Sequence, residues 1–193
     1  MKKIAILIDG GYLRAISTNA GKAYNPDFIE KFAIQCKAAD EEVLRILYYD
    51  CAQYEGYQKL PVSGNVHHFT ASDQWLIDLS RRDLFAVRRG VLKFRGFKPK
   101  STPVNPAALT DADFKPDFEQ KGVDMRIGLD IAVYAQNKAV DRVGLVSNDT
   151  DCVPPLKLGR RSGLQMIIIQ LPNCNVAPER AGSICRSASA SPT

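Results

Sequence analysis

Long hydrophobic runs are missing from this 193-residue sequence. No run approaches the roughly 20 apolar residues that a membrane helix needs. The longest run near the start, Ile4 to Ile8, is also too short for the core of a signal peptide. We therefore expect a protein that makes no membrane contact and is located in the cytoplasm.

Cysteine and histidine are too few and too scattered to build a metal site from thiolates or imidazoles. The five cysteines form no C-x-x-C pair and no zinc-ribbon spacing, so we expect reduced thiols. The two histidines, His67 and His68, are neighbours in a predicted strand and would point to opposite faces. The motifs G-x-x-x-x-G-K-[ST], G-x-G-x-x-G and G-x-S-x-G are missing as well, which disfavours the common nucleotide-binding and serine-hydrolase classes.

Positive charge is concentrated in one segment. Residues 81–100 hold eight of the 26 lysines and arginines but only one of the 21 acidic residues. This segment therefore has a net charge of +7 in a chain whose net charge is +5. Such a basic stripe is typical of a surface that binds a polyphosphate such as RNA. A solvated hairpin with basic residues on its wet face would give the same pattern.

Short apolar runs alternate with amphipathic segments, which predicts an α/β fold with a mainly parallel sheet. We expect strands at 3–8, 43–49, 66–70, 143–146 and 166–169, and helices beginning near 26, 75, 124 and 153. Residues 85–94 are predicted to be extended with a turn at Arg89-Gly90, and residues 98–120 to form a long surface loop. The length favours one domain, placed at 1–171, followed by a weakly patterned tail at 172–193.

Aspartates stand where two of the predicted strands end. Asp9 ends the first strand, and Asp149 follows the strand at 143–146. If these strands are parallel neighbours, about 4.8 Å apart, both carboxylates project into one crevice at the edge where open α/β sheets bind ligands. Carboxylates this close repel each other. A divalent cation with oxygen ligands, such as Mg²⁺, would offset the repulsion.

Three further acidic residues are candidates, and two of them have two interpretations each. Asp124 begins a helix on its apolar face, where it either reaches the same crevice or only stabilises the helix start. Asp151 either completes the cluster or caps the next helix. Asp130 borders the apolar face, where a structural hydrogen bond is the expected role. The residues expected to hold a water or phosphate oxygen, or to line the mouth of the crevice, are Ser147, Asn148, Tyr12 and Arg14.

An acidic cluster with a separate basic segment suits metal-dependent hydrolysis of a phosphodiester. The acids hold the metal, which makes hydroxide available near neutral pH and stabilises charge on the phosphoryl oxygens. The basic residues then hold the nucleic-acid backbone. A phosphoacceptor aspartate of the response-regulator type stays an alternative, but it leaves Asp124 and the basic segment unexplained.

Three motifs carry a family resemblance. They are Ile-Leu-Ile-Asp-Gly-Gly-Tyr-Leu at 6–13, Lys-Gly-Val-Asp-Met-Arg-Ile-Gly-Leu-Asp at 121–130 and Leu-Val-Ser-Asn-Asp-Thr-Asp-Cys-Val-Pro-Pro-Leu at 145–156. Together they resemble the NYN domain in its LabA-like (DUF88) branch, within the PIN-like nuclease group. The resemblance implies a Rossmann-like (PIN-like) three-layer α/β/α sandwich with a mainly parallel central sheet. It also implies an acidic cluster that binds Mg²⁺ or Mn²⁺, and ribonuclease activity.

Carried over position by position, the resemblance implies that Asp9, Asp124 and Asp149 hold the metal. It implies Asp151 as a fourth ligand. It also implies that Asp130 contacts the ligands without touching the metal. The sequence departs from the family pattern in the extra proline of Val153-Pro154-Pro155, in the weakly patterned tail beyond Leu171, and at two single positions. Asn148 stands where a glycine is usual, and Tyr12 stands where Asn is often seen.

The predicted function is a metal-dependent endoribonuclease that acts on RNA, expected to be single-stranded. The residues predicted to contact the RNA are Arg14, Arg88, Arg89, Lys93, Arg95 and Lys121. Two other classes stay open: a non-catalytic RNA-binding or regulatory module on the same PIN-like shell, and a protein-interaction domain. A homodimer stays open as a further partner.

Overall fold

The computed structural model describes residues 1–103, 108–170 and 184–187. The chain divides into two compact units. The first consists of residues 1–50, 74–89 and 122 onward, and the second of residues 51–73 and 90–121. The prediction of one domain over 1–171 did not separate the second unit from the first.

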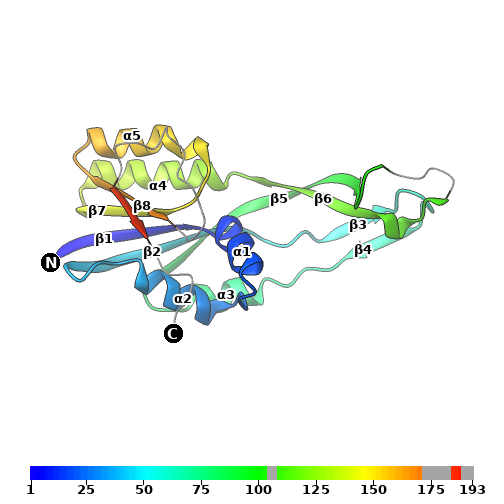
Figure 1. Cartoon of the computed structure of the whole chain (residues 1–193), viewed down its shortest axis with the longest axis horizontal. Helices are drawn as coiled ribbons and strands as arrows, with labels where there is room; N and C mark the ends of the chain where they lie inside the picture. Colours follow the sequence, from blue (N-terminus) through cyan, green and yellow to red (C-terminus); the bar gives the residue numbers. More distant parts are fainter. Residues whose placement is uncertain (104–107, 171–183, 188–193) are drawn as a thin grey trace. The chain divides into compact units, whose positions relative to one another are not determined.

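A mostly parallel sheet forms the centre of the first unit (Figure 1). Its strand order is β5-β2-β1-β7-β8-β9. The strands are β1 (Lys2–Asp9), β2 (Glu41–Cys51), β5 (Phe85–Pro99), β7 (Arg142–Val146), β8 (Gln165–Gln170) and β9 (Ile184–Ser187). β1 runs parallel to β2 and β7, and β8 runs parallel to β7 and β9. The carboxyl ends of β1 and β7 therefore lie at the same edge.

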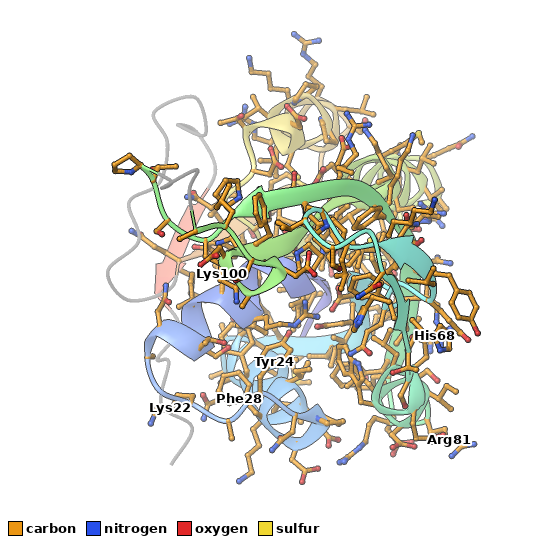
Figure 2. The ribbon with its side chains drawn as sticks, turned by 90° about the vertical axis from the view of Figure 1, so that its right-hand side faces the viewer. Lys22, Tyr24, Phe28, His68, Arg81 and Lys100 are labelled. Carbon is orange, nitrogen blue, oxygen red and sulfur yellow. The ribbon has the colours of Figure 1, made fainter. Side chains whose placement is uncertain are left out.

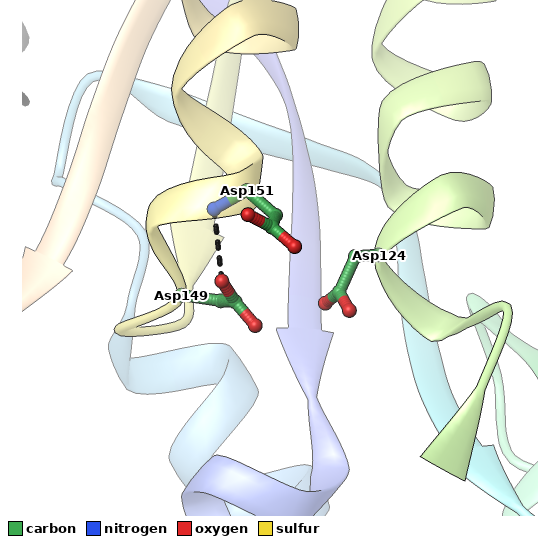
Figure 3. Close-up of side chains that lie close together, drawn as sticks. All are labelled: Asp124, Asp149 and Asp151. Atoms are coloured by element: carbon green, nitrogen blue, oxygen red, sulfur yellow. Dashed lines mark hydrogen bonds between the residues drawn. The ribbon is translucent and has the colours of Figure 1, made fainter.

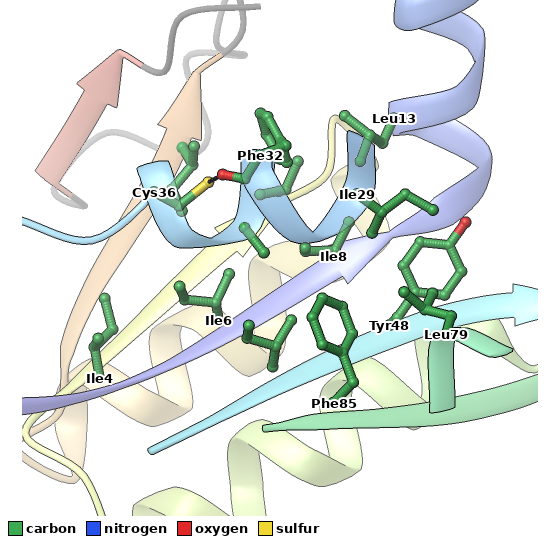
Figure 4. Packing of buried hydrophobic residues seen from close by; sticks show 14 of the residues in the cluster. Ile4, Ile6, Ile8, Leu13, Ile29, Phe32, Cys36, Tyr48, Leu79 and Phe85 are labelled. Carbon is green, nitrogen blue, oxygen red and sulfur yellow. Dashed lines mark hydrogen bonds between the residues drawn. The ribbon is translucent and has the colours of Figure 1, made fainter. Parts of the chain in front are cut away.

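Helices cover both faces of this sheet (Figure 1). They are α1 (Gly10–Asn19), α2 (Pro26–Gln35), α3 (Gln74–Ser80), α4 (Val123–Asn137) and α5 (Val153–Arg161). On one face, Gly159 of α5 lies against Met166 of β8 and Ile131 of α4. On the other face, apolar residues of α1, α2 and α3 join Ile4, Ile6 and Ile8 of β1 in one buried cluster (Figure 4). Because strand side chains alternate between faces, the apolar run of β1 is buried on both sides.

The predicted α/β class and mainly parallel sheet are confirmed, and so are the strands and helices expected in the first unit. The start of α2 shows why the local sequence was informative. The side chain of Asn25 accepts a hydrogen bond from the Phe28 amide at 2.9 Å, and Pro26 occupies the first turn. No helix among the described residues is long and apolar enough to cross a membrane.

The second unit consists of antiparallel hairpins. One pairs β3 (Gly56–Lys59) with β4 (Val66–Phe69), and the other pairs the distal part of β5 with β6 (Phe114–Lys121). The rings of Tyr54, Phe69, Phe94 and Phe118 pack together with centroids 5.5–6.0 Å apart. His68 stacks on Tyr57, whereas His67 contacts Phe69. The two histidines thus have different neighbours.

Two predictions for this unit are wrong. The turn expected at Arg89-Gly90 does not exist, because β5 continues through both residues to Pro99. The loop expected over residues 98–120 contains a short 3₁₀ helix at Asp111–Asp113 and all but the last residue of β6. The pairing of β6 with β5, which the local sequence does not reveal, orders this stretch.

The expected C-terminal tail also contains structure. Residues 184–187 form β9, which pairs with β8. The rest of the tail, residues 171–183 and 188–193, lies outside the described residues.

Candidate metal centre

The ends of β1 and β7 bring the predicted acidic segments together. The two strands are hydrogen-bonded neighbours with Ile8 opposite Val146, so Asp9 and Ser147 are the next residues on each. The chain then turns through a short 3₁₀ helix, η3 (Thr150–Cys152), before α5 begins. α4 lies beside α5 on the same face of the sheet (Figure 1), which brings its first turn to this edge.

Three carboxylates form a compact group at this edge (Figure 3). Asp124, Asp149 and Asp151 each present an oxygen, and these oxygens lie within 4.8 Å of one another. Asp124 comes from the first turn of α4, and the other two come from η3 and the residue that caps it. The segments at 121–130 and 145–156 thus supply carboxylates to one place.

Asp149 is held in place by its own turn. Its Oδ1 accepts a hydrogen bond from the Asp151 amide at 2.8 Å, which makes Asp149 the N-cap of η3. The alternative that Asp151 caps the next helix is wrong, because Cys152 is the residue at the cap position of α5. Asp151 is exposed, whereas Asp124 and Asp149 are partly buried.

Asp9 lies next to this group but is not one of its three members. Its carboxylate accepts hydrogen bonds from the Tyr12 amide at 3.1 Å and from the Ser147 hydroxyl at 3.2 Å. The Ser147 hydroxyl oxygen in turn accepts a bond from the Asp149 amide at 3.1 Å. Buried Ser147 therefore connects Asp9 with Asp149, and Asp9 also caps α1.

Burial and mutual repulsion disfavour the charged forms of two of these acids. Desolvation raises the pKa of Asp124, and the negative charges of Asp149 and Asp151 raise it further. Desolvation also raises the pKa of Asp9, against the lowering effect of its bonds from Tyr12 and Ser147. None of the groups that act most on either pKa is a cation. Both acids are therefore harder to ionise than an exposed aspartate.

Asp130 has a structural role at a different place on α4. Its carboxylate accepts two hydrogen bonds from the Arg88 guanidinium, at 3.0 and 3.1 Å, and one from the Tyr49 hydroxyl at 2.8 Å. The expectation of a structural hydrogen bond is confirmed. The family resemblance implied that Asp130 supports the metal ligands. These three bonds join it to Arg88 and Tyr49 instead. Of the other residues expected near the cluster, Asn148 is exposed and Tyr12 contributes its amide to Asp9.

Most cations predicted to contact RNA have acidic partners in the structure. Arg14 forms an ion pair with Asp50, and Arg88 forms one with Asp130. In the second unit, Glu119 lies within ion-pair distance of both Arg95 and Lys121. The pairs of Arg88 and Arg95 offset part of the positive charge that was counted for residues 81–100. Lys93 is exposed on β5, opposite Glu119, and Arg89 is exposed as well.

Sequence reasoning missed a buried polar network beside α1. Asp50 is 1% exposed, and its carboxylate accepts bonds from the guanidinium of Arg14 and from the Tyr48 hydroxyl at 3.1 Å. The Tyr24 hydroxyl lies 2.5 Å from that of Tyr48 and donates to the Gly10 carbonyl at 3.2 Å. The Tyr24 ring also lies beside Phe28, with centroids 6.0 Å apart (Figure 2). Asp50 follows a predicted strand, as Asp9 does, so the same signal could have identified it.

Comparison with known proteins supports the fold and adds no function. No protein-family model and no curated protein matches the chain. Its structure is similar to the crystal structure of a protein of unknown function, VPA0982 from Vibrio parahaemolyticus RIMD 2210633. That likeness covers 97% of this chain and 92% of the other, with a TM-score of 0.54 and 18% sequence identity. The two chains therefore share an overall fold.

Proposed function

We propose that the protein is a metal-dependent ribonuclease of the PIN-like, NYN type. The observation that carries this proposal is the group of Asp124, Asp149 and Asp151, whose oxygens lie within 4.8 Å of one another. The group lies where two neighbouring parallel strands end, which is the edge at which open α/β sheets bind ligands. The LabA-like resemblance of residues 6–13, 121–130 and 145–156 supports the same proposal.

The donor set fits Mg²⁺ or Mn²⁺. Carboxylate oxygens are the ligands that these hard cations prefer, and Mg²⁺ is usually held by few carboxylates while the substrate phosphate supplies further oxygens. A cation at this place would offset the repulsion that raises the pKa of Asp124. When bound, such an ion supplies a water of lowered pKa and stabilises charge on phosphoryl oxygens.

Hydrogen bonds within the chain would keep the metal-binding carboxylates in position. The Asp151 amide fixes the orientation of the Asp149 carboxylate, and Ser147 connects it with Asp9. Asp124 lies in the first turn of α4, where the helix dipole favours negative charge. We assign Asp9 to the site as a carboxylate that acts through Ser147 and through its own charge. RNA contact by Arg89 and Lys93, and a cytoplasmic location, remain parts of this proposal.

The test is cleavage of single-stranded RNA by purified Asp124→Asn and Asp149→Asn variants in Mg²⁺ or Mn²⁺. We expect each variant to lose at least about 100-fold in rate, because a removed ligand weakens charge stabilisation of the transition state. Asp141→Asn is the matched control, because Asp141 is an aspartate of the same unit that accepts a bond from the Lys3 amide at 2.7 Å. Full activity in both folded cluster variants would refute the proposal.

The same experiment separates the rival function. A non-catalytic RNA-binding module would bind the labelled RNA in a salt-dependent way and leave it intact at every metal concentration. Binding measured by fluorescence anisotropy beside the cleavage assay therefore distinguishes a nuclease, a binding module and a protein with neither property.

A further inference from the structure

The outward face of α4 is apolar, although nothing in the described structure covers it. Met125, Leu129 and Val133 are spaced four residues apart and are 67%, 59% and 52% exposed. The opposite side of the same helix carries Ile127, Ile131 and Ala135, which are buried. A surface helix normally has one apolar stripe and one polar face. A helix that is apolar on two opposite sides is typical of one that is covered on both.

The neighbouring helix α5 adds a further exposed apolar residue. The two helices lie side by side on the same face of the sheet (Figure 1). A Cβ built on Gly128 of α4 would lie 3.6 Å from Pro155 of α5, which is ordinary contact distance. Leu158 follows Pro155 by one turn and is 45% exposed. The outward face, which we define as Met125, Leu129, Val133 and Leu158, therefore covers two packed helices.

The chemistry of this face excludes a nucleic acid as its occupant. None of its four side chains carries a charge, whereas nucleic-acid binding needs cations that neutralise phosphates. Exposed contiguous apolar surface on a soluble domain instead marks a contact with another protein. In a two-fold contact each surface meets its own copy, so a charge near the axis would meet a like charge. An uncharged face avoids this repulsion.

The flank of α4 fits its own copy in one orientation. Arg126 and Asp130 lie on the same flank and are placed symmetrically about residue 128. If two α4 helices pack antiparallel and centred there, Arg126 of each copy comes level with Asp130 of the other. Within its own chain, Arg126 donates to the Gly122 carbonyl at 2.8 Å, and Asp130 accepts bonds from Arg88 and Tyr49. A contact between copies would therefore add to these bonds. A hollow of about 200 Å³ on this flank, lined by Arg88, Arg126, Leu129 and Asp130, leaves room for a side chain from the second copy.

We infer that the outward face of α4 and α5 is the contact surface between two copies of this chain, with their α4 helices antiparallel about a two-fold axis. This inference does not depend on the proposed nuclease activity. A stable dimer buries roughly 800 Å² on each partner, so the contact needs both helices.

The test is self-association of the full chain, measured by sedimentation equilibrium over a concentration series. We expect the parent chain to form a dimer and Leu129→Lys to weaken that dimer at least tenfold. Ile34→Lys is the matched control, because Ile34 is an exposed apolar residue, 48% exposed, on α2 at the opposite face of the sheet. It should leave the dimer unchanged. Circular dichroism confirms that both variants are folded.

A cross-link tests the orientation. Leu129→Cys places a thiol close to the inferred axis, so oxidation should give a disulfide-linked dimer on a non-reducing gel. The parent chain, with its own five cysteines, and an Ile34→Cys variant should not. A chain that is monomeric at every concentration would overturn the inference. So would a dimer that survives Leu129→Lys, and so would equal cross-linking of all three proteins.

Discussion

At the scale of single residues, the three clustered aspartates differ most from ordinary surface acids. Burial and the charges of Asp149 and Asp151 both raise the pKa of Asp124, so the ionised form of Asp124 is disfavoured in the folded protein. A raised carboxyl pKa means that stability decreases as the pH rises through that value. At neutral pH without metal, the ionised cluster therefore lowers the stability of the folded protein, and a bound cation would offset this loss.

We predict that Asp124→Asn is at least as stable as the parent chain in EDTA and is no longer stabilised by Mn²⁺. The parent should gain stability with metal, by about 2.7 kcal/mol when Mn²⁺ exceeds its dissociation constant 100-fold. Thermal unfolding in EDTA and in Mn²⁺ measures both effects. Glu42→Gln, at an exposed position on β2, should respond to Mn²⁺ as the parent does. Equal metal responses in Asp124→Asn and the parent would contradict a metal site at the cluster.

The cysteines illustrate a second effect of burial on a single residue. Cys36, Cys51 and Cys152 are buried and form no disulfide bond, in agreement with the reduced thiols that the sequence predicted. Cys174 lies outside the described residues. Cys36 is 0% exposed and its thiol donates to the Phe32 carbonyl at 3.2 Å. Desolvation raises the pKa of this thiol to about 12, with a smaller lowering effect from the charge of Arg186.

We predict that Cys36 does not react with a thiol reagent in the native protein at pH 8. At this pH about one Cys36 thiol in ten thousand is ionised, and the thiolate is the reactive form. Titration with Ellman's reagent should therefore give the same thiol count for the native parent and for native Cys36→Ala. In denaturant the parent should show one thiol more. A difference of one thiol between the two native proteins would show that Cys36 is accessible.

At the scale of elements, the junction of β1 and α1 next to the site is tightly packed. A Cβ built on Gly10, the first residue of α1, would clash with the Tyr48 hydroxyl and lie 2.8 Å from the Tyr49 carbonyl oxygen. Tyr48 cannot move aside easily, because it is 0% exposed and hydrogen-bonded to Asp50. Gly10 is therefore needed here for close approach of the helix to β2.

We predict that Gly10→Ala destabilises the protein by about 2 kcal/mol, as overpacking of a buried contact does. The matched control is Gly128→Ala in α4, where the nearest atom would be Pro155 Cγ at 3.6 Å. That variant should be neutral or more stable by up to about 1 kcal/mol, because alanine favours helix over glycine. Urea unfolding of both variants measures the difference. The prediction is wrong if the two substitutions have the same effect.

The elements also show what could be predicted from sequence and what could not. β1 was predictable because its apolar residues are contiguous and Asp9-Gly10-Gly11 marks its end. β6 was missed because Pro116 interrupts it, and because its partner residues in β5 lie far away in the sequence. Proline is tolerated in a strand at a sheet edge, and β6 is such a strand.

For the site, predictability followed the same division between local and distant contacts. The positions of Asp9 and Asp149 at strand ends follow from local pattern and parallel pairing. The pairing of Arg14 with Asp50, across 36 residues, has no local signal. The partner of Arg88, Asp130, lies 42 residues later in the sequence. The local pattern therefore could not show that Arg88 is paired, and Arg88 was predicted to contact RNA.

At the scale of the whole sheet in the first unit, acidic residues at the two edges have pKa shifts of opposite direction. The carboxyl edge gathers carboxylates, and Asp124 among them has a raised pKa. At the amino edge, Glu41 is 0% exposed and accepts hydrogen bonds from Arg142 at 2.7 Å and from Arg186 at 2.7 and 2.8 Å. The Ala38 amide also donates to Glu41, at 2.6 Å. These bonds connect β2, β7 and β9.

We predict that the Glu41 network makes stability depend on pH in the acidic range. Burial alone would raise the pKa of Glu41, but the bonds from Arg186, Ala38 and Arg142 lower it to about 2. For a carboxyl whose folded pKa is lowered, the stabilisation is complete above its unfolded pKa of about 4.5. It is lost as the pH falls toward 2. The stabilisation at neutral pH is on the order of 3 kcal/mol.

Urea unfolding of the parent chain and of Glu41→Gln at neutral pH and at pH steps from about 5 down to 3 checks this prediction. Glu41→Gln should be less stable at neutral pH, and the difference should shrink as the pH falls, because the parent gradually loses what the variant already lacks. Glu42→Gln, one residue along β2 and exposed, should follow the parent at every pH. A difference between Glu41→Gln and the parent that stays constant with pH would show that Glu41 stabilises the sheet by packing and not by its charge.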